Sequence, residues 1–304
     1  MDVLTETPRL VLLIANPAAR WGGRWLDQAR SAFDRAGVTC DAMITERPGH
    51  AAELAATHAP RYSAVFTLGG DGTAMEVIGA LAHGEVPVGV LPGGTGNLVA
   101  RALGIPLRIE RAIAELLDGD VATIDLGVVG VAGGVERRFA FAAGVGLDAR
   151  MVHETPPSLK RRLGFVAYAL TAARAALSRR EFTARVEVDG VVVERRAVAV
   201  MIANFGSVLS DLIMLGPGIL QDDGRLDVCI ISPSSNADAL RLAWRMFRRD
   251  FRPTESLHYL PGRSIRIDCD PPQLYQADGE VLGRTPFSAR VDPLAIKLLV
   301  PHKR

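Results

Sequence analysis

Short apolar runs alternate with helix-like segments through the first 120 residues of the chain. Four runs are typical of buried strands: residues 10–15, 38–44, 64–68 and 88–91. Four segments carry apolar residues three or four positions apart, as on one face of a helix: residues 25–36, 51–58, 75–81 and 108–117. This alternation predicts an α/β domain with a parallel sheet and helices on both of its faces.

The pattern changes near residue 125, and β-rich segments separated by turns then predominate. These segments are residues 128–131, 138–142, 182–188, 191–203, 224–231, 264–269 and 289–291. Asp189-Gly190, between two alternating runs, predicts a two-residue hairpin. We therefore expect one domain over residues 1–125 and a second over residues 126–304. The second should be an antiparallel sheet or sandwich with helices at 159–178 and 236–249, and its last residues can pack back on the first domain.

Composition indicates a folded protein of balanced charge. The 304 residues are 48% hydrophobic with a formal net charge of +1, which argues against a disordered chain, and no basic stripe predicts a nucleic-acid partner. Cys40, Cys229 and Cys269 are too widely spaced to predict a disulfide framework or a zinc site. The start does not have the pattern of a signal peptide, and no run approaches 18 apolar residues, so we expect a cytoplasmic protein with at most peripheral membrane contact.

Two glycine-rich turns follow successive strands and are the first candidates for chemistry. GGDGT (residues 69–73) follows the run at 64–68, and PGGTGN (residues 92–97) follows the run at 88–91. Both turns should lie at the carboxyl edge of the sheet, where glycines let a phosphate approach the backbone. Asp71 would repel a bare phosphate, so a magnesium ligand or a proton acceptor is the better interpretation. The alternatives are a packing turn for GGDGT and a helix cap by Thr95 or Asn97.

These turns, together with Asn16-Pro17 after the first strand, resemble the diacylglycerol kinase catalytic family, which includes bacterial lipid kinases and sphingosine kinases. Further motifs resemble the same family: GVGLDARM (144–151), LKRRLGFVAYAL (159–170), GPGILQDDGRLDV (216–228) and ADGE (277–280). The resemblance implies an α/β nucleotide domain followed by a β-sandwich, with the active site between them. It also implies ATP- and Mg²⁺-dependent transfer of the γ-phosphate to a hydroxyl of a lipid substrate, such as diacylglycerol or a sphingoid base.

The resemblance carries over to individual residues. Those implied to contact the nucleotide are Asn16, Gly69, Gly70, Gly72, Thr73, Gly94, Thr95, Gly96 and Asn97. Asp278 is implied as the general base beside Glu280, with Asp71 nearer the metal, and the reverse assignment stays open. Position 98 is Leu where the commonest bacterial form has an acid, so a metal role for that acid cannot be carried over. Glu76 is a further candidate for the acidic cluster.

Three carboxylates lie close together at Asp222, Asp223 and Asp227. A hairpin turn followed by a strand explains them without any ligand. The resemblance implies instead a structural Mg²⁺ or Ca²⁺ here, and three hard oxygen donors suit such an ion.

Other features of the sequence have alternative interpretations. NAD kinase shares GGDGT but pairs Asn with Glu where this chain has Asn97-Leu98, and a non-catalytic lipid- or nucleotide-binding protein is a further alternative. The GxGxxA pattern at residues 144–149 is rejected as a dinucleotide site because Pro156-Pro157 follows instead of a helix. The segment 240–251 is a basic amphipathic helix that suits a membrane surface or packing on the sheet equally well. A homodimer stays open.

Overall fold

The computed structural model describes residues 10–17, 22–131, 134–146, 181–208, 213–214, 218–248 and 250–302. The chain divides into two units, each of which is described by itself. Unit 1 comprises Met1–Asp125, Val208–Ser210 and Leu294–Arg304. Unit 2 comprises Leu126–Ser207 and Asp211–Pro293.

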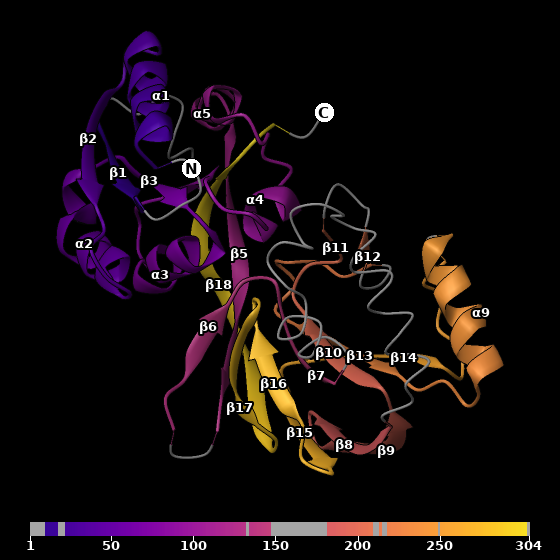
Figure 1. The fold of residues 1–304 in the computed structure, drawn as a ribbon. Coiled ribbons are helices and arrows are strands. Elements are labelled where there is room, and N and C mark those ends of the chain that lie inside the picture. Colours follow the sequence, from indigo (N-terminus) through magenta and orange to yellow (C-terminus); the bar gives the residue numbers. More distant parts are fainter. Residues whose placement is uncertain are drawn as a thin grey trace. The chain divides into compact units, whose positions relative to one another are not determined.

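Unit 1 contains a parallel sheet in the order β2-β1-β3-β4-β18 (Figure 1). Its strands are β1 (Leu10–Ala15), β2 (Thr39–Ile44), β3 (Ala64–Gly69), β4 (Val88–Pro92) and the end of β18 (Phe287–Val300). Strands β3 and β4 are buried along their whole length. This explains their continuous apolar sequence, because a parallel sheet is covered on both faces.

Helices cover both faces of this sheet. They are α1 (Gly22–Arg35), α2 (His50–His58), α3 (Asp71–Ala80), α4 (Leu98–Ala102) and α5 (Ile109–Leu117), and a 3-10 turn, η1 (Ala59–Arg61), follows α2. Figure 1 shows α1 with α5 on one face and α2 with α3 on the other. Phe33 of α1 meets Phe66 of β3 edge to face, with ring centroids 4.9 Å apart.

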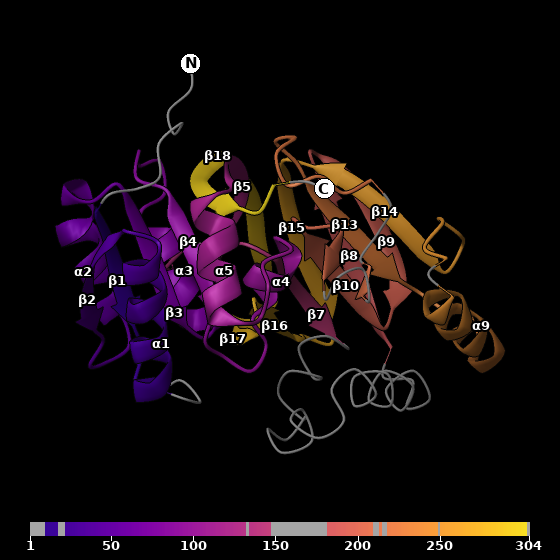
Figure 2. The same ribbon diagram turned by 90° about the horizontal axis from the view of Figure 1, so that it is seen from above.

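Two long strands pass from one unit into the other. They are β5 (Asp120–Gly130) and β18, which run down the view of Figure 1 and are foreshortened in the view from above (Figure 2). Asp125 of β5 is fully buried, and its Oδ1 accepts a hydrogen bond of 2.7 Å from the backbone N–H of Leu294 in β18. This bond joins the two strands at the end of unit 1.

Unit 2 contains two antiparallel sheets. One runs from the start of β18 through β15 (Ser264–Asp270) and β8 (Phe182–Val188) to β9 (Val191–Ala197). The other comprises, in order, β14 (Leu257–Gly262), β13 (Leu226–Ile231), β10 (Ala199–Ala203), β7 (Ala142–Gly146), β16 (Leu274–Ala277) and β17 (Glu280–Arg284). Apolar side chains from both sheets form one core, in which Tyr275 stacks on Phe287 with centroids 4.4 Å apart. Short strands β6 (Arg137–Phe139), β11 (Ser207–Val208) and β12 (Ile213–Met214) complete the described strands.

The predicted fold class is confirmed: an α/β domain with a parallel sheet precedes an antiparallel β-sandwich. Helix α9 (Asn236–Phe247) occupies the second predicted helical segment, whereas residues 159–178 lie outside the described residues. The single run expected at 191–203 is two strands, β9 and β10, in different sheets. Among the described residues, no helix has the length and apolar character needed to cross a membrane.

Candidate functional site

The two glycine-rich turns of unit 1 are in direct contact. They follow the neighbouring parallel strands β3 and β4, and the backbone N–H of Gly93 donates to the carbonyl of Gly69 at 2.9 Å. A Cβ on Gly93 would lie 2.6 Å from the Gly69 nitrogen, and one on Gly94 would lie 2.6 Å from the Gly70 Cα. Since real side-chain atoms do not approach backbone so closely, this contact requires glycine.

The Asn16-Pro17 motif lies beside the two glycine-rich turns. It follows β1, and its backbone N–H donates to the Leu68 carbonyl at 2.9 Å. Its side-chain Nδ2 donates to Thr73 Oγ1 at 3.2 Å, and this hydroxyl lies at the start of α3. The three motifs that are far apart in the sequence therefore meet at the carboxyl ends of β1, β3 and β4, where open α/β sheets bind their ligands.

Asp71 connects the two turns electrostatically. Its Oδ1 accepts hydrogen bonds from the backbone N–H groups of Leu98 at 2.6 Å and Val99 at 3.4 Å, so it holds the first turn of α4. Burial raises the pKa of this carboxyl, and the backbone N–H groups of Leu98 and Val99 oppose the rise. A carboxylate with a raised pKa is a better proton acceptor than an ordinary aspartate.

The cap of α4 differs from the one that the sequence suggests. Asn97 precedes α4 in a left-handed conformation with φ of 50°, and its side chain turns back to Gly94. Its Oδ1 accepts from the Gly94 N–H at 2.8 Å, and its Nδ2 donates to the Gly94 carbonyl at 3.0 Å. Asn97 thus closes its own loop, and Asp71, which lies 27 residues before Leu98, takes the capping role.

Glu76 does not join Asp71 in an acidic cluster but binds the start of α2. Its two oxygens accept backbone hydrogen bonds from Gly49 at 2.9 Å and Ala51 at 3.1 Å, at the start of α2. A carboxylate at this helix end satisfies unpaired N–H groups and the helix dipole. The structure therefore corrects the suggestion of a shared acidic cluster and gives Glu76 a structural role.

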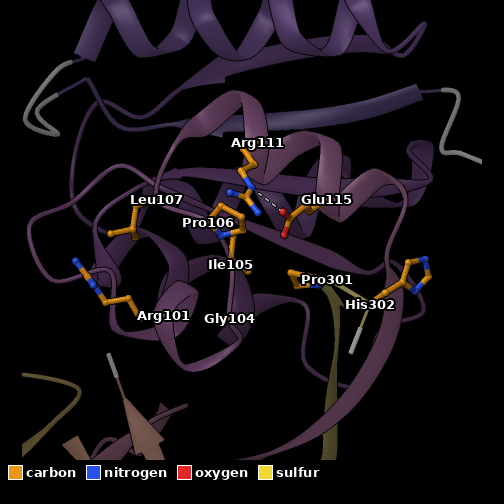
Figure 3. A pocket seen from close by; sticks show the side chains of 9 residues that line it. All are labelled: Arg101, Gly104, Ile105, Pro106, Leu107, Arg111, Glu115, Pro301 and His302. Carbon is orange, nitrogen blue, oxygen red and sulfur yellow. Dashed lines mark hydrogen bonds and ion pairs between the residues drawn. The ribbon is translucent and has the colours of Figure 1, made fainter. Parts of the chain in front are cut away.

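Arg101 was not singled out by the sequence motifs, and it connects the PGGTGN loop with a nearby hollow. Its Nε donates to the Gly96 carbonyl at 3.0 Å. The hollow has a volume of about 440 Å³ and lies on unit 1 (Figure 3). It is lined by Arg101, Gly104, Ile105, Pro106, Leu107, Arg111, Glu115, Pro301 and His302. Arg111 and Glu115 form an ion pair of 2.8 Å at its rim, so part of its charge is neutralised internally.

The glycine turns fit a nucleotide phosphate better than they fit a packing role alone. Gly72, Thr95 and Gly96 are exposed, although the strands that carry the turns are buried. A Cβ on Gly96 would lie 2.8 Å from Asp71 Oδ2, so the backbone there must stay bare beside the carboxylate. Exposed glycine backbone next to one carboxylate is a donor set that suits a phosphate accompanied by Mg²⁺.

Asp278 lies in unit 2, in the tight turn between β16 and β17. Its Oδ2 accepts from the Ala140 N–H at 2.7 Å, and its Oδ1 accepts from Phe141 at 2.9 Å and Ala142 at 3.0 Å. Its own N–H donates to the Ala142 carbonyl at 2.9 Å. The carboxylate is therefore held in one orientation against the segment that joins β6 to β7. Glu280, two residues later, is exposed and pairs with Arg137 at 2.7 Å.

The three aspartates proposed to hold a structural ion lie before and within β13. Asp222 and Asp223 are exposed, and Asp223 Oδ1 accepts from the Arg225 N–H at 3.0 Å in a local turn. Burial raises the pKa of Asp227, and the charge of Asp223 raises it further. Within the segments that the structure describes, no three His, Cys, Asp or Glu side chains gather as a metal site would require. The structural ion stays a prediction that these side-chain positions do not support.

Comparisons with known proteins agree with this arrangement. Residues 10–129 match the family model of the diacylglycerol kinase catalytic domain, and residues 142–300 match that of the YegS C-terminal NAD kinase beta sandwich-like domain. The chain is 30% identical over 253 residues to a protein of Mycobacterium tuberculosis named diacylglycerol kinase, covering 82% of this chain and 80% of that relative. It is 29% identical over 243 residues to an uncharacterized protein of Synechocystis sp., covering 79% of this chain and 55% of that relative.

A solved structure from Bacillus anthracis str. Sterne, described as a candidate diacylglycerol kinase, has the same fold. The TM-score is 0.79 at 24% identity, and the match covers 97% of this chain and 98% of that one. This likeness concerns the fold alone, whereas the family models cover both units of the chain. The chain therefore belongs to the diacylglycerol kinase family, with the catalytic-domain part toward its N-terminus and the NAD kinase-like β-sandwich toward its C-terminus.

Proposed function

We propose that this protein is a lipid kinase that transfers the γ-phosphate of ATP, with Mg²⁺, to a hydroxyl of a lipid such as diacylglycerol or a sphingoid base. The observation that carries the proposal is the meeting of the three motifs in unit 1, where Gly93 contacts Gly69 and Asn16 binds Thr73. The names of the relatives support the same activity. The lipid would accept the phosphoryl group, and this acceptor would distinguish the protein from kinases that phosphorylate nucleotides.

The residues of unit 1 would bind the nucleotide by their backbone. ATP would approach the exposed glycines at positions 72 and 96 and supply the phosphoryl group. Phosphoryl transfer passes through a loose transition state, so the protein contributes mainly positioning and charge neutralisation. Asp71 is the carboxylate in unit 1 suited to the Mg²⁺ that accompanies the phosphates.

Asp278 is proposed as the carboxylate that orients the acceptor hydroxyl and takes its proton. Three backbone N–H groups hold this carboxylate in place, and fixed orientation is what such a role requires. The same bonds stabilise its negative charge and weaken it as a base. In a loose transition state the proton of the acceptor hydroxyl is transferred late. The larger contribution of Asp278 to the rate would therefore be to orient this hydroxyl, and the smaller one to accept its proton. The reverse assignment, with Asp71 as base, is the alternative that its raised pKa favours.

A second candidate function is NAD kinase activity. The C-terminal family model describes an NAD kinase beta sandwich-like domain, and GGDGT is shared by both kinds of enzyme. The identity of the acceptor therefore has to be measured directly. A binding protein without catalysis is the remaining alternative.

The decisive experiment follows labelled γ-phosphate from ATP and Mg²⁺ into mixed micelles of diacylglycerol, monoacylglycerol, sphingosine, ceramide or phosphatidylglycerol, with NAD as a soluble acceptor. An organic-extractable product supports the proposal and names the acceptor class. Label on NAD alone would establish the second candidate. ATP binding without any labelled product would contradict both kinase proposals for these acceptors.

The nucleotide site has its own test with a matched control. Gly93→Ala places a Cβ 2.6 Å from the Gly69 backbone and should separate the two turns. We expect the ATP affinity to fall at least about tenfold, roughly 1.4 kcal/mol. Gly79→Ala in α3 is the control, because no atom lies within 4 Å of its added Cβ. Equal ATP affinity in both variants, measured by calorimetry, would exclude the paired turns as the nucleotide site.

A further inference from the structure

Helix α9 exposes two large apolar side chains on one face. Leu240 is 72% exposed and Trp244 is 58% exposed, and the two are four residues apart, so they are neighbours on the helix. Leu242, on the opposite face, is buried against Cys229 and Leu257 of unit 2. The helix therefore uses one face for packing and presents the other to solvent. Figure 1 shows α9 next to the β14 edge of its sheet.

Positive charge flanks the exposed apolar pair. At 100° per residue, Arg241 and Arg248 project within roughly 60° of Trp244 on the same side. Both are exposed, and the guanidinium group of Arg241 lies 4.0 Å from Asp238 Oδ1. The segment 236–252 holds five arginines and two aspartates, whereas the whole chain has a formal net charge of +1. The segment therefore carries an excess of positive charge, and Arg241 and Arg248 are the two arginines that lie beside the apolar pair.

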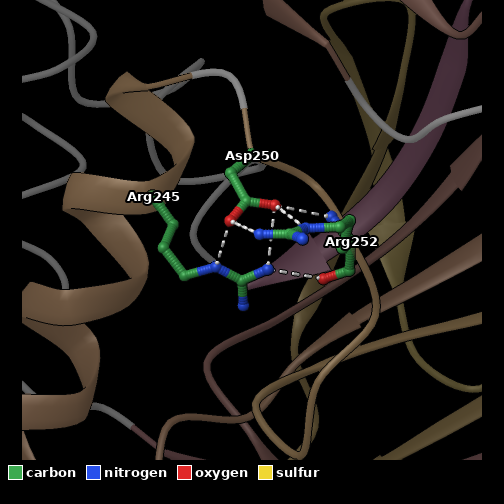
Figure 4. Close-up of polar contacts among 3 residues, drawn as sticks. All are labelled: Arg245, Asp250 and Arg252. Carbon is green, nitrogen blue, oxygen red and sulfur yellow. Dashed lines mark hydrogen bonds and ion pairs between the residues drawn. The ribbon is translucent and has the colours of Figure 1, made fainter.

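Both aspartates of the segment serve to anchor the helix. Asp238 accepts hydrogen bonds from Ser256 Oγ at 2.6 Å and from the Ser234 N–H at 2.9 Å, at the start of α9. Asp250 lies beyond the end of the helix and binds the guanidinium groups of Arg252 at 2.8 Å and Arg245 at 3.0 Å (Figure 4). The guanidinium groups of Arg252 and Arg245 hold the pKa of Asp250 well below its ordinary value. The acids thus fix the two ends of α9 and leave Arg241 and Arg248 to define the charge of the outer face.

We propose that α9 is a docking surface for a bilayer that contains anionic phospholipids. Leu240 and Trp244 enter the boundary between headgroups and acyl chains, while Arg241 and Arg248 contact the lipid phosphates. At 1.5 Å per residue the helix is about 18 Å long, which is too short to cross a hydrocarbon core of about 30 Å. It would therefore lie along the surface of the bilayer. Tryptophan is favoured at this depth, and basic side chains around an apolar strip are the pattern of interfacial helices.

A lipid surface fits this face better than a protein partner. A stable protein interface buries about 800 Å² on each side, far more than two side chains on one helix can supply. A bilayer accepts a narrow apolar strip, because the headgroups around it supply the matching negative charge. The inference deepens the proposed function, since a lipid acceptor would be reached at such a surface, but docking is measurable without catalysis.

The test is co-sedimentation of the full chain, without ATP, with vesicles of phosphatidylcholine containing phosphatidylglycerol. We expect Leu240→Ala/Trp244→Ala to lower the partition coefficient at least about tenfold. Arg241→Gln/Arg248→Gln should lower it about tenfold or more on anionic vesicles and leave binding to pure phosphatidylcholine unchanged. The fluorescence of Trp244, taken as the difference between the natural protein and Trp244→Phe, should be quenched by brominated lipids.

Two matched controls test whether the loss of vesicle binding is specific to α9 or follows from removal of any exposed apolar or basic side chains. Val191→Ala/Val192→Ala removes exposed apolar side chains from the β8–β9 hairpin, and Arg24→Gln/Arg195→Gln removes two exposed arginines elsewhere. Binding of the α9 variants at the level of the natural protein, or equal losses in the controls, would overturn the proposal. So would a change of oligomeric state, measured by sedimentation velocity without vesicles, that accounts for the loss. Activity on diacylglycerol in detergent micelles is recorded separately, so that a missing kinase activity is not mistaken for missing docking.

Discussion

Two Asp-Gly turns of unit 2 have nearly the same backbone, although the sequence motifs assign chemistry to only one of them. Asp189-Gly190 has φ values of 49° and 86°, and Asp278-Gly279 has values of 45° and 87°, as in two-residue hairpins. Both aspartates accept backbone hydrogen bonds from a distant segment. Asp189 Oδ1 accepts from Arg263 at 3.0 Å and Ser264 at 2.8 Å.

The two turns differ in how completely the carboxylate is engaged. Asp189 is exposed, whereas Asp278 is half-buried and receives three N–H groups from Ala140, Phe141 and Ala142. In unit 2, an aspartate with a left-handed backbone conformation can therefore serve only to bind a neighbouring segment through backbone hydrogen bonds. If Asp278 is catalytic, its replacement must reduce activity more than replacement of an aspartate that only holds such a turn. Asp189 is the matched control for this comparison.

The largest expected effect separates the two aspartates by activity. Asp278→Asn should lower kcat for lipid phosphorylation at least about a hundredfold, because it removes both the proton acceptor and the carboxylate that orients the hydroxyl, and general-base contributions alone are typically 10²–10⁴-fold. The KM for ATP should stay within about twofold, since unit 1 carries the proposed nucleotide site. Asp189→Asn, in the same kind of turn, should retain kcat within about threefold. Steady-state kinetics on micellar diacylglycerol measures all of these values.

Retained activity in Asp278→Asn would refute the base assignment and favour Asp71. Equal losses in the Asn variants of Asp278 and Asp189 would instead indicate that both act through the fold. The pH dependence of kcat offers a further check, because removal of the base should abolish its acidic limb.

The second effect is on stability and concerns the same pair. Asp278→Ala leaves three N–H groups of a largely buried segment without their acceptor, so we expect a loss of about 2–3 kcal/mol in the free energy of unfolding. Asp189→Ala exposes its former partners to water and should cost no more than about 1 kcal/mol. Denaturation by urea at pH 7 measures both. A larger loss for Asp189→Ala would show that the number of hydrogen bonds does not account for the difference between the turns.

Asp71 provides a third test, in which activity and stability should move in opposite directions. Burial raises its pKa, so the folded protein favours the protonated form more than the unfolded chain does. Its contribution to stability is therefore present below the ordinary carboxyl pKa and is lost as the pH rises through the raised value. Asp71→Asn keeps an Oδ1 acceptor for Leu98 without the charge, and it should unfold at higher urea concentration than the natural protein at pH 7.

The activity of Asp71→Asn should nevertheless fall roughly ten- to a hundredfold, as is usual when a group that supports a metal is replaced. Asp34→Asn in α1 is a control that removes one exposed carboxylate from the same unit. A variant that is both less stable and less active would contradict the proposed desolvation of Asp71.

The fold was accessible from the sequence wherever local periodicity determines it. The predicted runs at residues 10–15 and 182–188 coincide with β1 and β8, because buried and alternating strands leave direct patterns. Strands β14, β16 and β17 were not predicted. Strand β14 ends in Pro261-Gly262, which is typical of a turn, and β16 and β17 shift register between Tyr275 and Gln276, which breaks the alternation that a sequence pattern needs.

The site was predictable as a set of residues but not as a set of contacts. Glycine turns after apolar runs indicate a loop at the sheet edge, and the structure brings Asn16, GGDGT and PGGTGN together there. The bond from Leu98 to Asp71 spans 27 residues, and those that hold Asp278 span 136 to 138. Such partners have no fixed spacing in the sequence, so the capping role of Asp71 and the anchoring of Asp278 required the tertiary structure.

The smallest expected effect tests whether the exposed turn depends on charge. The N–H groups of Ser264 and Arg263 hold the pKa of Asp189 below its ordinary value of 3.8. Because the folded pKa is lowered, the contribution of Asp189 to stability is present above pH 3.8 and is lost as the pH falls through the lowered value. The difference in unfolding free energy between the natural protein and Asp189→Asn should therefore be constant from pH 7 to about pH 5 and shrink below pH 4. A difference independent of pH, measured by urea denaturation across this range, would show that the turn relies on neutral hydrogen bonding, and the contrast with Asp278 would then rest on burial alone.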